Sequence, residues 1–498
     1  MEKMKKFTLI FTVLALAASV SAAAQIMPEA QTGATCTDHG TADSKAITAA
    51  GSTVSAGSSA DANTAQPAAD TITIHKMTLR DCMLYALEHS TDVLVKQTET
   101  ADARVDRREA ILKTFTPYVS GSTYAYSYFG RNIDPETNTY VTTTSFNNGM
   151  SLSTGITLFD GFSAVNNMRI AKTSVSMGLS NEEQEEDKVC LATTEAFFNV
   201  IYYTSLVDII AEQVDNAKSA VKLATRQEEL GSKGHADVVQ MQADLADKEY
   251  ELVSTQNSLQ NAIITLKDVM LWPLDEQLVL DTDIESLKSE RKLLDFGEIS
   301  ANAEAFLPKV AISRGTRDNA RLSLRTAKWS FLPSLSLYGG WSSSYYTYPG
   351  NDDYISTPYF EQIKRNAGEY VQLSLSIPIY SRLDKINTLS RKRNAYRRAS
   401  LQYDQTLREV ESEVRRAMQD RDGAEAALLQ AERRSDVQSE AYKLNFKKFD
   451  QGLISSIEYQ TAASSYLKAR AEQLNAQMQY LLKERVVRYY NGEHYLDQ

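Results

Sequence analysis

Cysteine and long runs of positive charge are nearly missing from this chain of 498 residues. Its three cysteines, Cys36, Cys82 and Cys190, are far apart and odd in number, which argues against a disulfide framework or a zinc cluster. We expect Cys82 and Cys190 to be small packing residues, with a disulfide or a reactive thiol as the alternative. The formal net charge is −11 and no basic run is long enough to bind phosphates, so nucleic acid is not an expected partner.

The sequence signatures of enzymes are also missing. The five histidines are scattered without metal-ligand spacing, and the chain contains no Gly-x-Ser-x-Gly elbow, phosphate loop or dinucleotide fingerprint. We predict that the protein is not an enzyme and uses no cofactor and no metal. Two weaker alternatives are a pH sensor at His235 and a cation site at Asp352 and Asp353.

An apolar run near the N-terminus, from Phe7 to Ala18, is shorter than the roughly 20 residues that a membrane-spanning helix needs. Three lysines precede it and Ser-Val-Ser-Ala-Ala-Ala-Gln follows it, as in an exported protein. We predict a signal peptide over residues 1–24, with a membrane anchor as the alternative. Residues 25–76 are rich in alanine, serine, threonine and glycine with few large apolar side chains, which predicts a disordered leader.

Proline is missing where the sequence predicts its longest helix. None occurs between Phe162 and Leu230, so one helix of about seventy residues, on the order of 100 Å long, is expected there. Apolar residues recur at alternating spacings of three and four, as in a coiled coil, along two seams. They run through Val207, Ile210, Val214, Ala217, Val221 and Ala224, and through Leu407, Val410, Val414, Ala417, Arg421, Ala424 and Leu428. We predict a mainly α-helical fold with a small β part, built on long antiparallel coiled-coil hairpins; a cytoskeletal or scaffolding coiled coil is the alternative.

The two halves of the chain resemble each other. Several stretches of the first half recur in the same order in the second, for example Leu230–Leu245 as Gln451–Tyr466. We predict an internal duplication, with a first repeat over residues 77–285 and a second over residues 286–492. Each repeat is expected to contain a helix, two strands, a long helix, a tight turn and a further helix.

Four short segments alternate apolar and polar residues, which is the period of a β-strand with one apolar face. We expect strands at about 117–130, 146–160, 333–346 and 369–380, close to the length that crosses a hydrocarbon core when tilted. The apolar positions that we predict to face lipid are Met150, Leu152, Ile156, Leu158, Leu335, Leu337, Val371, Leu373, Leu375 and Ile377. Aromatic residues near the loop-side ends suggest an interfacial belt: Tyr124, Tyr126, Tyr128, Phe129, Trp341, Tyr345, Tyr346 and Tyr348. A soluble sheet packed on the helices is the alternative.

Four strands are too few to close a barrel, and lipid does not tolerate an open sheet edge. The smallest closed membrane barrels have about eight strands, so the chain is expected to pool its strands with other copies of itself. This argument requires an oligomer and does not fix the number of subunits.

The export signal, the duplicated halves and the strand-to-helix junctions Ile-Thr-Leu-Phe-Asp-Gly-Phe and Ile-Pro-Ile-Tyr-Ser-Arg-Leu together resemble the TolC family of outer-membrane efflux and secretion channels. The resemblance covers about residues 77–492. It implies a homotrimer whose pooled strands form one transmembrane β-barrel in outer-membrane lipid, continued by a helical tunnel with a long periplasmic portion. It also implies two partners: a periplasmic adaptor (membrane fusion) protein and an inner-membrane pump of the RND, ABC or MFS type.

The resemblance assigns roles to the residues around two predicted turns. The adaptor-contacting tips would be Gly231, Ser232, Lys233, Gly452, Leu453 and Ile454. Asp237 and Glu458, each six residues beyond a turn glycine, would form the periplasmic pore constriction; from the residues alone, first-turn helix caps explain these two carboxylates as well. Family members carry an arginine that clamps the tips shut, and Ile454 stands in its place here, so the usual latch is not expected.

The function that this resemblance implies is a passive outer-membrane exit duct of a tripartite efflux pump, which carries small molecules across the periplasm and the outer membrane. One alternative is the outer-membrane component of type I protein or peptide secretion. A surface-exposed adhesin or structural coiled-coil protein is a less favoured alternative, because it would not need amphipathic strands in matched pairs.

Overall fold

The computed structural model describes residues 76–133, 138–281, 295–349, 355 and 357–498. The predicted signal peptide over 1–24 and the predicted leader over 25–76, apart from Lys76, lie outside the described residues. The described part belongs to one compact unit, from Lys76 to Gln498. Within it, no helix combines the length and the apolar character needed to cross a membrane.

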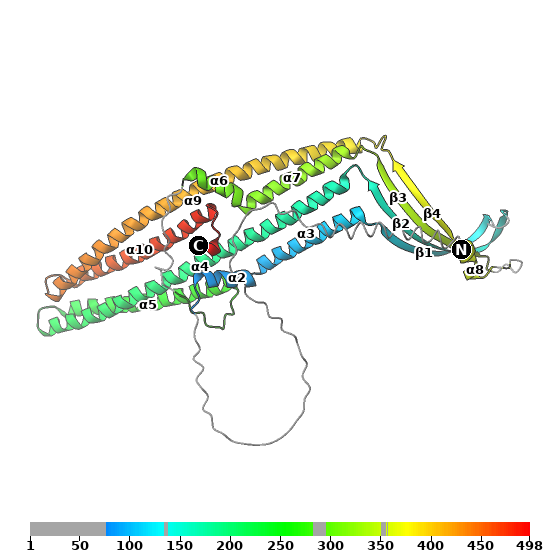
Figure 1. Ribbon diagram of the computed structural model, residues 1–498. Coiled ribbons are helices and arrows are strands. Elements are labelled where there is room, and N and C mark those ends of the chain that lie inside the picture. Colours follow the sequence, from blue (N-terminus) through cyan, green and yellow to red (C-terminus); the bar gives the residue numbers. More distant parts are fainter. Residues whose placement is uncertain (1–75, 134–137, 282–294, 350–354, 356) are drawn as a thin grey trace, which may run out of the picture. The chain divides into compact units, whose positions relative to one another are not determined.

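Long helices dominate the fold, which confirms the prediction of a mainly α-helical protein (Figure 1). Two helices of 67 residues each are about 100 Å long, and each packs along the antiparallel helix that follows it: α4 on α5, and α9 on α10. The helices are α2 (Leu79–His89), α3 (Thr91–Phe115), α4 (Ser163–Glu229), α5 (His235–Met270), α6 (Phe296–Phe306), α7 (Pro308–Trp329), α8 (Tyr359–Arg365), α9 (Asp384–Asp450), α10 (Ser456–Tyr490) and the short 3₁₀ helix η2 (Tyr495–Asp497).

Every residue of the two predicted seams is buried or half-buried on the long helices. On α4, Ile210, Val214 and Ala217 are buried, and on α9, Val410 and Val414 are fully buried. The basic residue within the second seam, Arg421, is also buried and bonds to Asp422, with Nη2 2.7 Å from its Oδ1. The Arg421 Nε lies 3.9 Å from Glu484 Oε2 on α10. A charge is therefore accommodated in the seam because carboxylates on α9 and α10 lie beside it.

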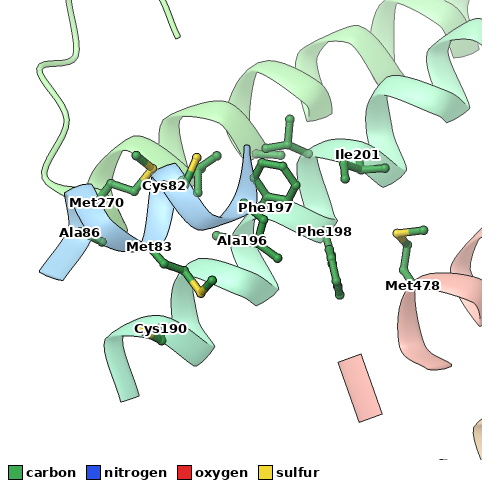
Figure 2. Close-up of a cluster of buried hydrophobic side chains, with 14 of the residues drawn as sticks. Cys82, Met83, Ala86, Cys190, Ala196, Phe197, Phe198, Ile201, Met270 and Met478 are labelled. Carbon is green, nitrogen blue, oxygen red and sulfur yellow. The ribbon is translucent and has the colours of Figure 1, made fainter. Parts of the chain in front are cut away.

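A core cluster forms where α2 lies against α4 and α5, and residues of α10, which packs on α4, complete it (Figure 2). Cys82 and Met83 of α2 and Cys190 and Phe197 of α4 are all buried within it. Both cysteines are free thiols, and burial raises their pKa values to about 12, so neither is reactive near neutral pH. The prediction that they are packing residues is confirmed.

The four strands form one antiparallel sheet in the order β1-β2-β3-β4. They are β1 (Tyr118–Ile133), β2 (Tyr140–Phe159), β3 (Ser334–Thr347) and β4 (Gly368–Ser376). The fourth strand is shorter than predicted, because it ends at Ser376 rather than residue 380. Pro378 follows shortly after and has no N–H to donate to a neighbouring strand. Ile377, predicted to be a lipid-facing strand residue, therefore lies beyond β4.

The chain turns sharply from each hairpin into a long helix, through two consecutive residues with left-handed backbone. Before α4 these are Gly161 and Phe162, with φ of 66° and 62°, and before α9 they are Arg382 and Leu383, with φ of 50° and 63°. This conformation costs a non-glycine residue roughly 1–2 kcal/mol. The second junction thus makes the same bend as the first without any glycine.

Helix α8 covers the edge of β3 beyond the point where β4 begins. The Gln362 side chain accepts a hydrogen bond from the Tyr346 N–H at 3.0 Å and donates one to the Tyr346 carbonyl at 2.8 Å. Asn366 Nδ2 donates to the Ser344 carbonyl at 2.7 Å. These amide side chains take the place of a strand and satisfy backbone groups that an exposed edge would leave open.

Candidate functional site

The site predicted at the two helical turns begins with glycines in the left-handed conformation. Gly231 and Gly452 both have φ of 71°. At the first turn the N–H of Gly231 bonds to Glu228 O and that of Ser232 to Gln227 O; at the second, Gly452 and Leu453 make the equivalent bonds to α9. Both patterns are Schellman motifs, which satisfy carbonyls at the end of a helix. A Cβ at either glycine would meet no atom within 4 Å, so the constraint on these positions is the backbone angle.

One set of contacts between the two tips joins side chains of the first tip to backbone carbonyls of the second. Gln227, near the end of α4, donates to the carbonyls of Phe449 and Asp450 at 3.3 and 3.1 Å. Lys233 Nζ donates to the Ile454 carbonyl at 3.2 Å. The first tip therefore supplies donors to carbonyls at the end of α9 and in the turn after it, and the Phe449 carbonyl also accepts from the Gly452 N–H.

Lys233 is held by two contacts. Besides its bond to Ile454 O, its ammonium lies 4.0 Å from the centroid of the Phe449 ring, a cation–π geometry. Burial lowers the pKa of Lys233, and the nearby Asp237 carboxylate opposes that shift. The second tip has Ile454 at the position where the resemblance would place the family's arginine, and the cation that joins the tips is on the first tip.

The two predicted constriction carboxylates occupy different environments. Glu458 completes a capping box at the start of α10: its Oε2 accepts from the Ser455 N–H at 3.0 Å, and its own N–H donates to Ser455 Oγ at 3.2 Å. Asp237, in the first turn of α5, accepts a 2.7 Å hydrogen bond from Ser456 Oγ of the other tip. Glu458 therefore acts within its own helix cap, whereas Asp237 joins the tips.

An apolar cluster behind the turns joins all four long helices. Its buried members come from α4 and α5 and from α9 and α10: Ala220, Ala224, Val238, Met241, Phe449 and Tyr459. The rings of Phe449 and Tyr459 stack with centroids 4.8 Å apart. Gln460 of α10, the residue after Tyr459, donates from its Nε2 to the Oδ1 of the buried Asp244 of α5 at 2.9 Å. Burial raises the pKa of Asp244, and the hydrogen bond from Gln460 partly offsets this.

Sequence reasoning missed several residues of this site. Gln227, Ser456 and Gln460 make contacts between the tips, and each is an ordinary polar residue of a helix in the sequence. Leu230, which precedes the first turn glycine, was also missed; its side chain is 75% exposed, and that of the predicted tip residue Leu453 is 69% exposed. Exposure of a large apolar side chain at a helix tip is the signal that marks Leu230, and only the structure shows it. His235 was considered as a pH sensor; its Nδ1 lies 2.9 Å from Glu228 Oε1 on its own tip.

The second predicted site is the apolar face of the sheet. Strand register places Ile156 opposite Leu337, Leu337 opposite Leu373, and Leu335 opposite Leu375. On this apolar face lie the predicted residues Met150, Leu152, Ile156, Leu335, Leu337, Val371, Leu373 and Leu375. Leu158 is an exception, because a register shift between Thr157 and Phe159 makes Phe159 the partner of Leu335.

The predicted aromatic belt is wrong for several tyrosines. Only Phe129, Trp341 and Tyr345 share the apolar face. The register puts Tyr124, Tyr126, Tyr128 and Tyr346 on the opposite face, together with the serines, and we call this the serine face. Alternation of side chains along a strand decides this, since all four tyrosines have even numbers, as do most serines of β1 and β3; Ser127 and Ser343 are on the apolar face.

Comparison with known proteins gives one family. The model of the outer membrane efflux protein family matches residues 86–270 and 298–492, which together make up more than half of the chain. No curated protein sequence matches this chain.

Several solved structures share the fold. CusC is similar with a TM-score of 0.71 and 16% identity, over 83% of this chain and 92% of that chain. The outer membrane protein VceC from Vibrio cholerae has a TM-score of 0.67 and 13% identity, over 83% and 96%. The MtrE outer membrane channel of Neisseria gonorrhoeae, in its open state, has a TM-score of 0.68 and 14% identity, over 83% and 88%.

The family match and the structural neighbours agree with each other. The structural neighbours include outer membrane channels, and the two matched segments contain α3 to α5 and α7 to α10 with all four strands. The predicted resemblance to TolC-type channels is confirmed. The chain belongs to the outer membrane efflux protein family.

Proposed function

We propose that the protein is the passive exit duct of a tripartite efflux pump, which carries small molecules from an inner-membrane pump and a periplasmic adaptor across the periplasm and the outer membrane. The observation that carries this proposal is a two-faced sheet, apolar on one side and polar on the other, continuous with helices about 100 Å long. A sheet with such faces suits a wall between lipid and water.

The sheet supports assembly with further copies of the chain. Among the described strands, β1 and β4 each pair on one side only. In lipid each unpaired backbone group costs several kcal/mol, so the two edges need partners, and the β4 edge of one copy suits the β1 edge of the next. Structural likeness to the channel proteins supports a trimer. In that assembly the apolar face would contact lipid and the serine face would line the lumen.

The tips are suited to docking and closure. Leu230 and Leu453 present apolar side chains to solvent at the two turns, where a coiled-coil adaptor would gain from burying them. The contacts of Gln227, Lys233 and Asp237 with the second tip would hold the two hairpins of one subunit together in the closed state. Opening would then require these contacts to break.

Conductance in planar lipid bilayers tests the duct. The purified protein in detergent should insert and produce stepwise increases in current, because a closed barrel with a polar lumen conducts ions. Protein that stays monomeric without detergent and produces no current would contradict the proposal.

Binding of a purified periplasmic adaptor tests the tip. Gly452→Asp should abolish co-purification, since it strains the left-handed turn and adds a charge beside the exposed Leu453. Gly423→Asp, at an exposed glycine within α9, is the matched control and should leave adaptor binding unchanged. Equal binding by both variants would show that the adaptor docks elsewhere.

A further inference from the structure

The serine face of the sheet has an unusual composition. Along β1, from Tyr118 to Tyr128, and at the positions of the other strands paired with these residues, it carries only tyrosine, serine, glycine, asparagine and glutamine. No charged and no aliphatic side chain occurs at these described positions. Serines form cross-strand hydrogen bonds, Ser120 with Ser153 at 2.8 Å and Ser122 with Ser151 at 2.7 Å.

Tyrosines on this face lie across glycines of the neighbouring strands. Tyr124 is paired with Gly149, and a Cβ built on that glycine would lie 2.3 Å from the Tyr124 Cζ. Gly155 lies under Tyr118 and Tyr338 in the same way, and Gly340 lies under Tyr370. Each ring therefore extends sideways over a bare backbone rather than standing away from the sheet.

These rings leave one face available. Tyr118 and Tyr124 are each more than half exposed although their ring atoms cover glycines of the neighbouring strand, and Tyr126 is also more than half exposed. The rings of Tyr124 and Tyr126 are nearly parallel, with an interplanar angle of 18° and centroids 6.1 Å apart. The sheet thus presents a row of aromatic faces bordered by hydroxyl groups.

We propose that the serine face is a stacking surface for planar aromatic solutes that are uncharged or cationic. The proposal rests on the proposed function, because the face becomes a channel wall only in the assembled barrel. Stacking on an aromatic ring needs no particular hydrogen-bond pattern, so it tolerates many planar compounds. The π-electrons of a tyrosine ring attract cations. The described positions of the serine face carry no basic residue that would attract anions.

Equilibrium binding of proflavine, a planar tricyclic cation, to the detergent-solubilised assembled protein tests the proposal. Fluorescence of the dye would give its affinity, and competition by tetrapropylammonium, a cation without rings, would measure the contribution of charge alone. Tyr124→Ser should weaken proflavine binding about tenfold, as expected for the loss of one stacking ring. Tyr124→Phe keeps the ring and should retain the affinity.

A glycine pair gives a second test that leaves every tyrosine in place. Gly149→Ala forces the Tyr124 ring off the sheet and should also weaken binding, whereas Gly339→Ala, whose Cβ meets no atom closer than 3.6 Å, should not. Conductance of each preparation in planar bilayers reports whether channels assemble. Channels whose proflavine affinity is unaffected by Tyr124→Ser, or matched by tetrapropylammonium, would overturn this inference alone. Failure of the unaltered protein to form channels would overturn it together with the proposed function.

Discussion

The turns after α4 and after α9 share one backbone and differ in their side chains. Gly231 and Gly452 have the same φ and make the same pair of terminal hydrogen bonds. Around the first turn, however, Lys233 and Asp237 reach the other tip, while Glu458 of the second turn caps its own helix. The two turns therefore keep one backbone shape, while their side chains make different contacts: Lys233 and Asp237 reach the second tip, and Glu458 stays within its own helix cap.

Substitution of the two carboxylates, Asp237 and Glu458, should reveal the largest difference between the two tips. Asp237→Ala leaves the Ser456 hydroxyl, which is 1% exposed, without its partner and should cost about 2 kcal/mol of tip stability. Glu458→Ala removes half of a capping box and should cost about 1 kcal/mol or less, confined to the start of α10. Native-state hydrogen exchange should show faster exchange in both turns for Asp237→Ala and in the second turn alone for Glu458→Ala. The same pattern from both variants would show that the two carboxylates are equivalent.

Replacement of the turn glycines should affect both tips equally. Gly231→Ala and Gly452→Ala each force a side chain into a left-handed backbone, at a cost of about 1–2 kcal/mol, with open space around the added methyl group. Gly234→Ala is the matched control, because Gly234 has φ of −87° and equally open surroundings. Urea denaturation of the three variants, monitored by circular dichroism, measures this difference. A loss at Gly234 as large as at Gly231 would contradict the backbone explanation.

Lys233 should affect the contact between tips rather than either turn alone. Lys233→Met removes one hydrogen bond to Ile454 and the cation–π contact with Phe449, for a loss of about 1 kcal/mol. Because this loss opens the contact more often, a cysteine introduced at Ile454 should then react about five times faster with a thiol reagent. The native cysteines of the described chain are buried and should add little background labelling. Lys222→Met, at an exposed lysine of α4, serves as the control. An unchanged labelling rate would remove Lys233 from the contact.

Asp244 should give the smallest effect and a dependence on pH. Its pKa is raised in the folded protein by burial, so the folded state binds a proton more readily than the unfolded chain, whose carboxyl titrates near 3.8. Tip stability should therefore fall as the pH rises from 3.8 through the folded pKa, and stay at the lower level at neutral pH. Asp244→Asn keeps an acceptor for Gln460 and should remove this dependence while stabilising the tip at pH 7. Thermal unfolding between pH 4 and pH 7 measures it; stability that rises with pH in both proteins would refute the assignment.

Several features of the fold could be predicted from short-range patterns. Absence of proline between Phe162 and Leu230 predicted a helix that the structure confirms as α4. Alternation of Leu335 and Leu337 with serines predicted β3 within one residue at each end. The end of β4 was missed because alternation continues through Ile377 and Ile379, whereas hydrogen bonding stops near Pro378. The register shift near Leu158 was missed because it depends on the partner strand.

The amino-acid sequence alone predicted the length of α4, the alternation of the strands and the positions of the turn glycines. These properties depend on contacts within a few residues along the chain, where periodicity and backbone preference act. Only the tertiary structure decided that Lys233 reaches Ile454, that Asp237 meets Ser456 and that Tyr124 covers Gly149. Each of these contacts joins two elements whose relative position is fixed by packing and strand register, which no local pattern encodes.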